Sequence, residues 1–464
     1  MGSLLKFDFS KFPLAEHGYC ERPMRFLDAG ASSAFAAILE LTLIETGRRA
    51  AWERWQKVQL RNLLTHATQR SGFWRERMRK RTPDTKLSAL PILTRSDVQR
   101  QVRLEGALLD AADGHETTEH STSGSSGIPV RFFASGMNTR YNSARALLHF
   151  FNEGKDLSLN YTAIRTAHPE NFREVAGNPC GFVVKRKPSW LGALDSVITS
   201  GGQKIIEHLA LDVQALIDEL RKDPVGYLVT NPRTLAMILS HHEAELLREL
   251  KVSECVLYGE SADPELVEAV RNRGIPVRSS YSSEEVGQIG FECGTCAGHY
   301  HVTTSNVIVE VVDPSHEVGG TKLGRVLVTH LHSYATPFIR YDLGDLALLK
   351  DRCPCGHDGP VIHKLHGRAT NALKRRDGTL HPFLIRGHEL LEVAQFSEFR
   401  IRQVDFEMLM IELGGREALS ADEVQNVVRF LKARCGEEFA VEVVPRAVID
   451  WGHSVKRQSF RCEV

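Results

Sequence analysis

The sequence predicts an α/β protein with a large N-terminal domain and a small C-terminal α+β domain. Between residues 161 and 281, short apolar runs alternate with helical stretches, which is typical of a largely parallel sheet covered by helices. From 307-VIVEVVD-313 onward, β-rich runs replace the helical stretches, so we expect a β-rich subdomain after the parallel sheet. The polar stretch 367-GRATNALKRRDGTLHP-382 then separates domain 1–366 from domain 367–464.

The alternation is regular enough to locate individual segments. Short apolar runs are typical of strands, and longer stretches with apolar residues at intervals of three and four are typical of helices. The alternating segments are 161-YTAIRTA-167, 205-IIEHLALDVQALIDELRK-222, 225-VGYLVT-230, 232-PRTLAMILSHH-242, 254-ECVLYG-259, 263-DPELVEAVRNRG-274 and 276-PVRSSY-281.

The N-terminal region is predicted to be helical. From about residue 30 to 80, apolar residues recur at intervals of three and four with charges between them, which indicates amphipathic helices. In the next segment, 88-SALPILTRSD-97, Thr94 stands immediately before a helical charge pattern. A threonine at that position caps a helix, so we expect a helix to begin after Thr94.

Composition and charge exclude several classes of protein. The 58 Lys and Arg residues equal the 58 Asp and Glu residues, so the basic signature of a nucleic-acid binder is missing. The most apolar early window, 34-AFAAILELTLIETG-47, contains Glu40 and Glu45, is too short to span a bilayer, and follows no signal-peptide pattern. We therefore expect a cytoplasmic protein that binds neither nucleic acid nor membrane; a homodimer is compatible with the sequence.

The stretch 121-STSGSSGIPV-130 is a candidate anion-binding loop. Its two glycines allow the backbone to approach a ligand closely, and successive N–H groups with Ser or Thr hydroxyls can surround a phosphate. It is not a Walker loop, because the chain contains no G-x-x-x-x-G-K-[ST] pattern. Taken alone, these residues are equally compatible with an ordinary polar turn.

Two further segments carry side chains that suit a nucleotide and its metal ion. The segment 281-YSSEEVG-287 follows a predicted strand and offers an aromatic ring that can stack on a base and carboxylates that can hold Mg²⁺. The segment 336-TPFIRYDLGD-345 places Asp345 on a glycine-containing turn, where a carboxylate can accept hydrogen bonds from ribose hydroxyls. Taken alone, each segment is also compatible with a solvated turn.

Four of the nine cysteines form two close pairs, 293-CGTC-296 and 353-CPC-355. Such spacing favours metal ligation over a disulfide framework, and four thiolates can hold zinc in a closed tetrahedral site. We predict a structural zinc ion with the ligands Cys293, Cys296, Cys353 and Cys355. His299 and His301 are the alternatives to Cys296, and free thiols on a turn are the alternative to a metal site.

In their order and spacing, these segments resemble the acyl-adenylate-forming superfamily, and within it the phenylacetate-CoA ligase and CapK-like branch. The resemblance covers nearly the whole chain, from 59-QLRNLLTHATQRSGFWRERM-78 and 90-LPILTRSDV-98 to the terminus. It implies that residues 1–366 form an adenylation domain and that residues 367–464 form a mobile domain, which rotates about the region of Arg368 between two half-reactions.

The resemblance also implies which residues bind ATP. The residues that match the phosphate loop are Thr122, Ser123, Gly124, Ser125, Ser126 and Gly127. The residues that match the turn against the adenine are Gly259, Glu260 and Ser261, and Tyr281 matches the aromatic residue that stacks on it. Asp345 matches the acid that holds the ribose hydroxyls.

Three residues match catalytic positions of the superfamily. Glu285 matches the Mg²⁺-binding glutamate, and Arg368 matches the hinge arginine that approaches the phosphate or ribose. Lys456 matches the lysine that reaches the carboxylate and the α-phosphate, where a fixed positive charge stabilises the transition state. The chain departs from the family pattern at Val130 (loop lysine), Glu284 (Ser or Thr), Ala369, Thr370 and Asn371 (acidic hinge pair) and Val455 (glycine).

The reaction that the resemblance implies is activation of a carboxylic acid by Mg·ATP. The products are an acyl-adenylate and pyrophosphate, and the nearest branch favours an aromatic or small acid. Coenzyme A is the favoured acyl acceptor, with a carrier-protein thiol, an amine or a hydroxyl as alternatives. Two other classes stay open: a nucleotide-binding homologue with weakened turnover, and an enzyme that leaves AMP on its acceptor.

Overall fold

A twelve-stranded mixed sheet organises the chain before residue 369, with the strand order β11-β12-β13-β14-β10-β9-β8-β7-β6-β3-β5-β4. This computed structural model describes residues 29–109, 115–122, 130–167, 171–195, 198–208, 212–241, 245–259, 262, 264–318, 320–368, 372–376, 380–383, 385, 390, 393–396, 398–450 and 460–464. The predicted α/β class is confirmed, with a parallel part, a β-rich part and a small C-terminal α+β unit.

The N-terminal region is helical, as the sequence predicts. Its elements are α1 (Ala29–Glu45), α2 (Arg49–Arg70), α3 (Gly72–Arg77), the 3₁₀ turn η2 (Leu87–Ala89) and α4 (Arg95–Glu105). The predicted cap of α4 is confirmed: Thr94 Oγ1 accepts from the Asp97 backbone N–H at 3.2 Å, and the Asp97 carboxylate accepts from the Thr94 backbone N–H at 3.0 Å. This reciprocal capping box satisfies two of the backbone donors that a helix start leaves exposed.

The parallel part of the sheet alternates with helices, as predicted. Its strands are β3 (Tyr161–Thr166), β5 (Gln203–His208), β6 (Gly226–Thr230), β7 (Val252–Leu257) and β8 (Val277–Ser283), with β4 (Phe182–Lys187) antiparallel at the edge. The helices are α5 (Gly136–Asn152), α6 (Phe172–Ala176), α7 (Val213–Leu220), α8 (Pro232–His241), α9 (Leu246–Glu249) and α10 (Pro264–Arg271), with η5 (Gly192–Leu194). Leu216 of α7 packs with Ile206 and Leu228 of the strands in one buried apolar core.

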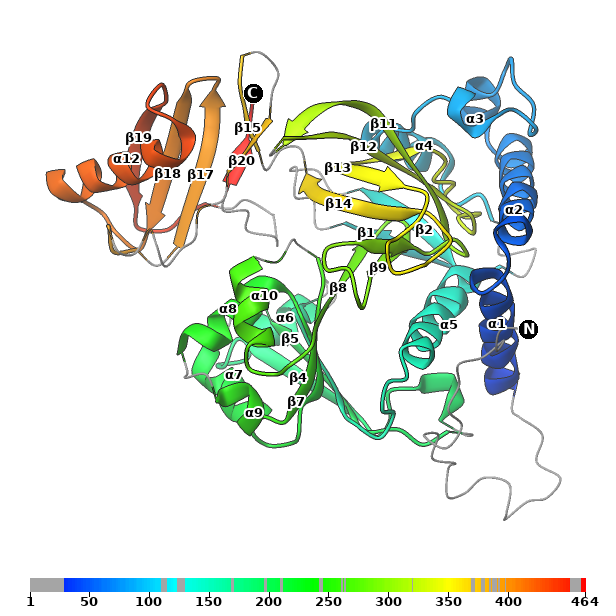
Figure 1. Cartoon of the computed structure of the whole chain (residues 1–464), viewed down its shortest axis with the longest axis horizontal. Helices are drawn as coiled ribbons and strands as arrows, with labels where there is room; N and C mark the ends of the chain where they lie inside the picture. Colours follow the sequence, from blue (N-terminus) through cyan, green and yellow to red (C-terminus); the bar gives the residue numbers. More distant parts are fainter. Residues whose placement is uncertain are drawn as a thin grey trace.

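The β-rich part continues the same sheet with antiparallel strands. These are β9 (Gly287–Glu292), β10 (Tyr300–Val302), β11 (Val307–Val318), β12 (Thr321–His330), β13 (Tyr341–Lys350) and β14 (Val361–Arg368). A separate hairpin consists of β1 (Thr117–Ser121) and β2 (Arg131–Ser135). One apolar core joins this hairpin and helices α2 to α4 to the antiparallel strands. In Figure 1, β8 connects the parallel part of the sheet below to the antiparallel part above.

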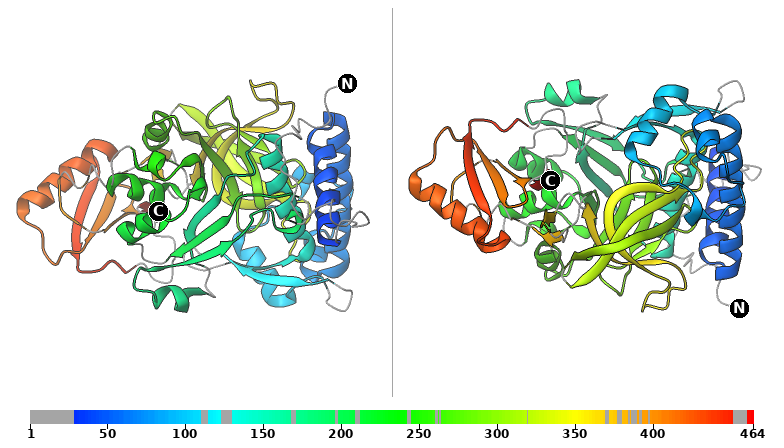
Figure 2. Two further views of the ribbon diagram at one scale, coloured as in Figure 1. Left: turned by 90° about the horizontal axis from the view of Figure 1, so that it is seen from below. Right: turned by 90° about the horizontal axis from the view of Figure 1, so that it is seen from above.

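The C-terminal unit has its own sheet and its own apolar core. Its elements are the hairpin β15 (Ala372–Lys374) and β16 (Leu380–Pro382), the strands β17 (Glu398–Asp405), β18 (Met408–Gly414), β19 (Ala440–Arg446) and β20 (Phe460–Cys462), and α12 (Ala421–Cys435). The four-stranded sheet has the order β19-β18-β17-β20, and α12 packs on it through Val427 and Leu431. This unit lies at the opposite end of the molecule from α1 and α2 (Figures 1 and 2).

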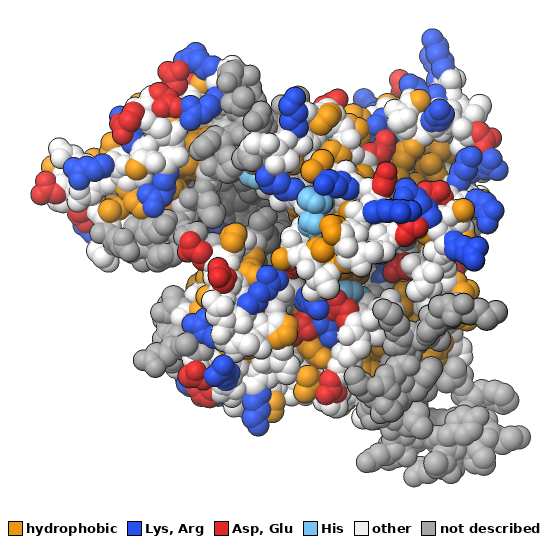
Figure 3. Space-filling model, viewed as in Figure 1, with side chains coloured by type: hydrophobic (Ala, Val, Ile, Leu, Met, Phe, Trp, Pro, Cys, Tyr) orange, Lys and Arg blue, Asp and Glu red, His pale blue; other side chains and the backbone are white. Residues whose placement is uncertain are grey.

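The described surface carries charges of both signs. On the face shown in Figure 3, Lys and Arg side chains intermingle with Asp and Glu side chains, in keeping with the equal numbers of the two in the sequence. None of the helices among the described residues combines the length and apolar character needed to cross a bilayer.

Candidate functional site

Tyr281 and Asp345 meet where the parallel and antiparallel parts of the sheet join. Tyr281 lies on β8, which pairs with β7 in parallel and with β9 antiparallel. Its hydroxyl donates a hydrogen bond of 2.7 Å to Asp345 Oδ2, across 64 positions of sequence. The structure therefore brings an aromatic ring and a carboxylate together at a change of strand direction, a position where open α/β sheets bind ligands.

Glu285 lies in the turn between β8 and β9. The Tyr341 hydroxyl donates to Glu285 Oε1 at 3.1 Å, and Arg95 Nη1 lies 3.9 Å from the same oxygen. The Glu285 side chain is only 9% exposed, whereas the neighbouring Glu284 is exposed. Of the two adjacent acids, Glu285 is therefore the one whose carboxylate joins the residues of β13, and Glu284 is turned toward solvent.

Thr122 and Val130 close the neck of the predicted phosphate loop. The Thr122 backbone N–H donates to the Val130 carbonyl at 3.0 Å, and the Val130 N–H donates to Thr122 Oγ1 at 3.0 Å. The Val130 side chain is fully buried in the apolar core with Leu93 and Phe132. The other predicted loop residues, Ser123, Gly124, Ser125, Ser126 and Gly127, lie outside the described residues.

Arg95 is the residue that the sequence analysis missed. It is the first residue of α4, and its Nη2 donates to Thr122 Oγ1 at 3.0 Å while Nη1 approaches Glu285. Two backbone hydrogen bonds hold this segment against β13: Leu93 N–H donates to the Arg340 carbonyl, and Asp342 N–H donates to the Leu93 carbonyl, both at 2.9 Å. The sequence carried one signal, a cation directly after the Thr94 cap, where the helix dipole disfavours positive charge.

Two of the predicted residues, Gly259 and Arg368, are described by their backbone. Glu260, Ser261 and Lys456 lie outside the described residues, as do two of the departures from the family pattern, namely Val455 and the stretch 369–371. Gly259 follows β7 with a φ of 84°, a left-handed conformation that favours glycine. The backbone of Arg368 pairs with Asp345 across β13 and β14, and its side chain is not described.

The remaining charged residues of 336-TPFIRYDLGD-345 have structural partners. Arg340 is 6% exposed and pairs with Glu310 at 2.9 Å, and it adopts a φ of 54°. Asp342 pairs with Arg325 at 2.8 Å. These two pairs hold the start of β13, the strand that carries Tyr341 and Asp345.

Cysteine and histidine side chains gather beside β10. Cys293, His301, Cys353 and Cys355 each offer one donor atom within 4.8 Å of the others, and Cys296 and His299 form a second group with Cys353. The Cys353 and Cys293 sulfurs are 3.9 Å apart, close to the separation of about 3.7 Å between two thiolates on one tetrahedral zinc ion. Three of the predicted ligands are therefore grouped, with His301 rather than Cys296 as the fourth member.

The electrostatics of this cluster suit a cation. Burial raises the pKa of the Cys353 thiol to about 12, and the neighbouring thiols add to the rise. Burial also raises the pKa of Cys293, but hydrogen bonds from Thr295 and from the Cys296 N–H outweigh it and bring the pKa to about 7. Thiols that are crowded together resist a second negative charge unless a metal ion neutralises it.

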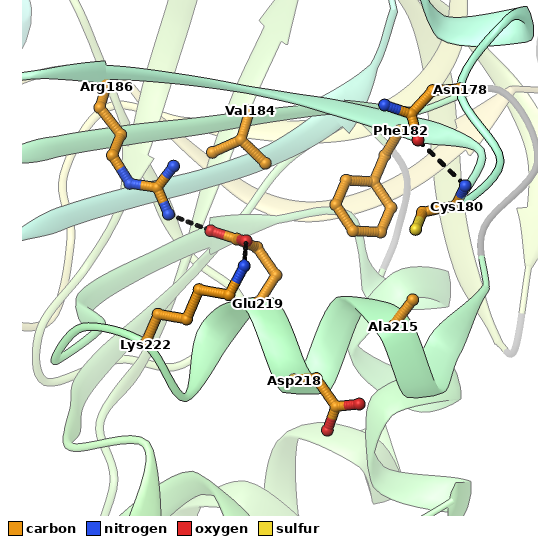
Figure 4. Close-up of a pocket in the computed structure, with 9 residues that line it drawn as sticks. All are labelled: Asn178, Cys180, Phe182, Val184, Arg186, Ala215, Asp218, Glu219 and Lys222. Atoms are coloured by element: carbon orange, nitrogen blue, oxygen red, sulfur yellow. Dashed lines mark hydrogen bonds and ion pairs between the residues drawn. The ribbon is translucent and has the colours of Figure 1, made fainter.

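A groove between β4 and α7 is lined by none of the predicted site residues; Figure 4 shows the side chains that line it. It has a volume of about 500 Å³, and its walls include Phe182, Arg186 and Glu219. Glu219 pairs with Arg186 and, at 2.8 Å, with Lys222, so the charges in the groove neutralise one another. We therefore assign the candidate site to the junction of β8, β13 and α4.

The protein has the fold of acyl-CoA ligases and of an acyl acid amido synthetase. A structure of 2-hydroxyisobutyryl-CoA ligase in the postadenylation state, in complex with R3-HIB-AMP, matches with a TM-score of 0.62 and 15% sequence identity, over 91% of each chain. The same enzyme with 2-HIB-AMP and CoA, in the thioesterification state, matches with a TM-score of 0.54 and 16% identity, over 91% of this chain and 92% of its own.

The GH3.15 acyl acid amido synthetase matches with a TM-score of 0.50 and 13% identity, over 88% of this chain and 89% of its own. No protein-family model matches the chain, and no curated protein matches its sequence. At these identities, the likeness to solved structures establishes the fold.

Proposed function

We propose that the protein is an adenylate-forming ligase that activates a carboxylic acid with Mg·ATP and passes the acyl group to an acceptor. The observation that carries the proposal is the convergence of three sequence motifs through side-chain contacts. Tyr281 contacts Asp345, and Glu285 contacts both Tyr341 and Arg95, which in turn contacts Thr122 at the loop neck. Residues that suit the metal ion and the phosphates thus form one chain of contacts, and the pair that suits the ribose lies on β8 and β13, the strands next to it.

The first half-reaction joins the acid to AMP. A carboxylate oxygen attacks the α-phosphorus of ATP, the bond from that phosphorus to the bridging oxygen breaks, and the electron pair leaves with pyrophosphate. Asp345 would accept bonds from the ribose hydroxyls, and Tyr281 and residues 259–261 would contact the adenine. The loop 122–127 would bind the β- and γ-phosphates, and Lys456 would stabilise charge at the reacting centre.

The carboxylate of Glu285 suits Mg²⁺, a hard cation that prefers oxygen ligands. Bound with the nucleotide, Mg²⁺ would neutralise charge on the phosphates. The small exposed fraction of the Glu285 side chain and the hydrogen bond from Tyr341 orient the carboxylate before any ion arrives. Preorganisation of this kind reduces the reorganisation needed on binding.

The second half-reaction transfers the acyl group from AMP to a nucleophile. Coenzyme A is the acceptor we propose, and the presence of CoA with the adenylate in a structure of the same fold supports it. An amine is the second candidate, because the same fold occurs in an acyl acid amido synthetase. In either case we propose that domain 367–464 moves relative to domain 1–366 about the region of Arg368.

The motifs favour the phenylacetate-CoA ligase and CapK-like branch, and hence an aromatic or small acid. We also propose a structural zinc ion held by Cys293, His301, Cys353 and Cys355. Purified protein should then contain about one zinc per chain, and Cys353→Ser should lose it, while Cys296→Ser should keep it. His301→Ala should also lose the ion, whereas retention by His301→Ala together with loss by Cys296→Ser would restore Cys296 as the ligand.

Carboxylate-dependent exchange of pyrophosphate into ATP tests the function. We expect exchange with at least one member of a panel of aryl and short acyl acids, and its loss in Lys456→Ala but not in Lys432→Ala, a control on the surface of α12. Absence of exchange with every acid, while ATP still binds, would identify a nucleotide-binding homologue. Mass spectrometry of the acceptor separates acyl transfer from AMP transfer by the mass added.

A further inference from the structure

Val130 is part of the apolar core, and it stands where the resemblance leads us to expect a positively charged side chain. The resemblance places a lysine at the end of the phosphate loop, but this chain has valine there, and the structure buries that side chain completely in the core below β2. A side chain at this position points away from the surface of the loop neck. A cation that meets the β- and γ-phosphates in place of that lysine therefore has to come from another part of the chain.

Arg95 lies at the required place. Its guanidinium donates to Thr122 Oγ1 at 3.0 Å, and the same hydroxyl accepts from the Val130 N–H, so Arg95 contacts the residue that closes the loop neck. Its other terminal nitrogen is 3.9 Å from Glu285, the proposed Mg²⁺ ligand. One cation thus lies between the loop that is proposed to bind phosphate and the carboxylate that is proposed to bind the metal ion.

We propose that Arg95 binds the β- and γ-phosphates of ATP and stabilises the leaving pyrophosphate, in place of the lysine that Val130 replaces. A guanidinium presents a planar set of donors that matches phosphate oxygens and stays charged at every physiological pH. When the bond between the α-phosphorus and the bridging oxygen breaks, negative charge grows on the pyrophosphate side, where a fixed cation lowers the barrier. This inference rests on the proposed adenylation.

The contact with Glu285 explains how Arg95 is held before the nucleotide binds. The Arg95 side chain is 25% exposed, and the 3.9 Å separation is that of a loose ion pair. When Mg·ATP binds, Arg95 would contact phosphate oxygens and Glu285 would contact the metal ion, and each of these contacts would be closer than the present ion pair. The pair therefore keeps both side chains at the site without binding them too strongly to release.

Calorimetry with AMP, ATP and inorganic pyrophosphate tests the proposal. In Arg95→Ala, the Kd for ATP and for pyrophosphate should rise by about tenfold to a hundredfold, whereas the Kd for AMP, which lacks the β- and γ-phosphates, should change by less than about twofold. Arg95→Lys should recover part of the ATP affinity, because it keeps the charge. Arg103→Ala, an exposed position in the last turn of the same helix, should match the wild type.

Each outcome separates this inference from the proposed function. Exchange in the wild type with unchanged ATP and pyrophosphate affinity in Arg95→Ala would overturn the role of Arg95 and leave adenylation standing. An equal loss of affinity for AMP and ATP, with no recovery in Arg95→Lys, would assign Arg95 a purely structural role and overturn the proposal. If the wild type binds ATP but shows no pyrophosphate exchange, the proposed adenylation is wrong. A selective loss of ATP affinity in Arg95→Ala would in that case still support phosphate binding by Arg95.

Discussion

The part of the candidate site that we propose binds the base and ribose (the base end) and the part that we propose binds the phosphates (the phosphate end) are built in different ways. At the base end, Tyr281 and Asp345 project from two strands of one sheet, and both match the residues that the resemblance implies. At the phosphate end, a loop neck and the first turn of α4 meet, and the expected cation is replaced by buried Val130. The two strands carry the residue types that the resemblance implies, whereas at the phosphate end we propose that Arg95 of α4 supplies the charge.

This difference has a physical origin. A side chain on a strand has a fixed direction, so only that position can present a group at that point of the sheet edge. A loop end is surrounded by several elements, and a long guanidinium side chain can reach it from any of them. Substitution at the phosphate end is therefore easier to compensate than substitution at the base end.

The largest effect is expected for Val130→Lys. Because the side chain is fully buried beside Leu93 and Phe132, a lysine there would place a charge in an apolar core and lower the free energy of unfolding by about 3–5 kcal/mol. Urea unfolding followed by tryptophan fluorescence measures this, because Trp74 lies in the same core. Lysine at this position should therefore not restore a phosphate-binding loop.

Ser121→Lys is the matched control for that variant. Ser121 is exposed and adjacent to Thr122, so the same added charge should change the free energy of unfolding by less than about 0.5 kcal/mol. If Val130→Lys were as stable as Ser121→Lys and bound ATP more tightly than the wild type, Val130 would belong to the phosphate site, and the contrast between the two ends would disappear.

The next largest effect is expected for Glu285→Gln, at the point where the two ends meet. Glutamine keeps the shape of the side chain and an acceptor for the Tyr341 hydroxyl but removes the negative charge. The Mg²⁺ concentration for half-maximal exchange should rise by about tenfold, which corresponds to about 1.4 kcal/mol. Glu284→Gln, the exposed neighbour, should change it by less than about twofold, and a larger effect there would assign the metal ion to Glu284.

Tyr281→Phe tests the base end alone. Removing the hydroxyl that donates to Asp345 at 2.7 Å frees the carboxylate to turn, so the affinities for AMP and ATP should fall together by about tenfold. This pattern contrasts with Arg95→Ala, which should weaken ATP and spare AMP. Tyr300→Phe, whose ring lies 6.2 Å from that of Tyr281, is the control and should leave both affinities within about twofold of the wild type. A selective loss of ATP affinity in Tyr281→Phe would mean that Tyr281 also affects phosphate binding, and that the two ends do not act separately.

The sequence predicts the fold class and the order of elements because those depend on local periodicity. The alternating segments between residues 161 and 281 become β3, β6, β7 and β8 with α8 and α10, and the Thr94 cap starts α4 as expected. The segment 205–222 instead divides into the end of β5 and α7, and β4 falls in no predicted segment. The meeting of Tyr281 with Asp345 could be anticipated only through the resemblance. Their contact spans 64 residues, and no periodic pattern encodes which strands of a twelve-stranded sheet become neighbours.

Two features of the site could not be predicted, because they depend on packing. The direction of the Val130 side chain is set by the core under β2, and a one-residue change of register would have exposed it. The role of Arg95 depends on the backbone bonds between Leu93 and β13, which bring α4 to the loop neck. In the same way, His301 joins the cysteines because β10 pairs with β14 close to Cys353, a pairing that cysteine spacing alone does not reveal.

The smallest effect is expected for Asp97→Asn, which tests the scaffold of the phosphate end. Partial burial raises the pKa of Asp97, but hydrogen bonds from Thr94 and the charges of Arg77 and Arg100 outweigh it, so the pKa lies below its usual value of 3.8. The charged carboxylate therefore stabilises the folded state above pH 3.8, and this stabilisation is lost as the pH falls through the lowered pKa. Asparagine should cost about 0.5–1 kcal/mol at pH 7.

That stability difference should shrink toward zero once the pH falls below the lowered pKa of Asp97, because the carboxylate of the folded wild type is then protonated as well. Asp84→Asn is the control, since Asp84 forms an exposed pair with Arg61 and should contribute less than about 0.5 kcal/mol. Fraying of the first turn of α4 would also loosen Arg95, so ATP affinity should fall slightly while AMP affinity stays unchanged. Equal changes in both affinities would mean that α4 supports the base end as well, and that the two ends are not built independently.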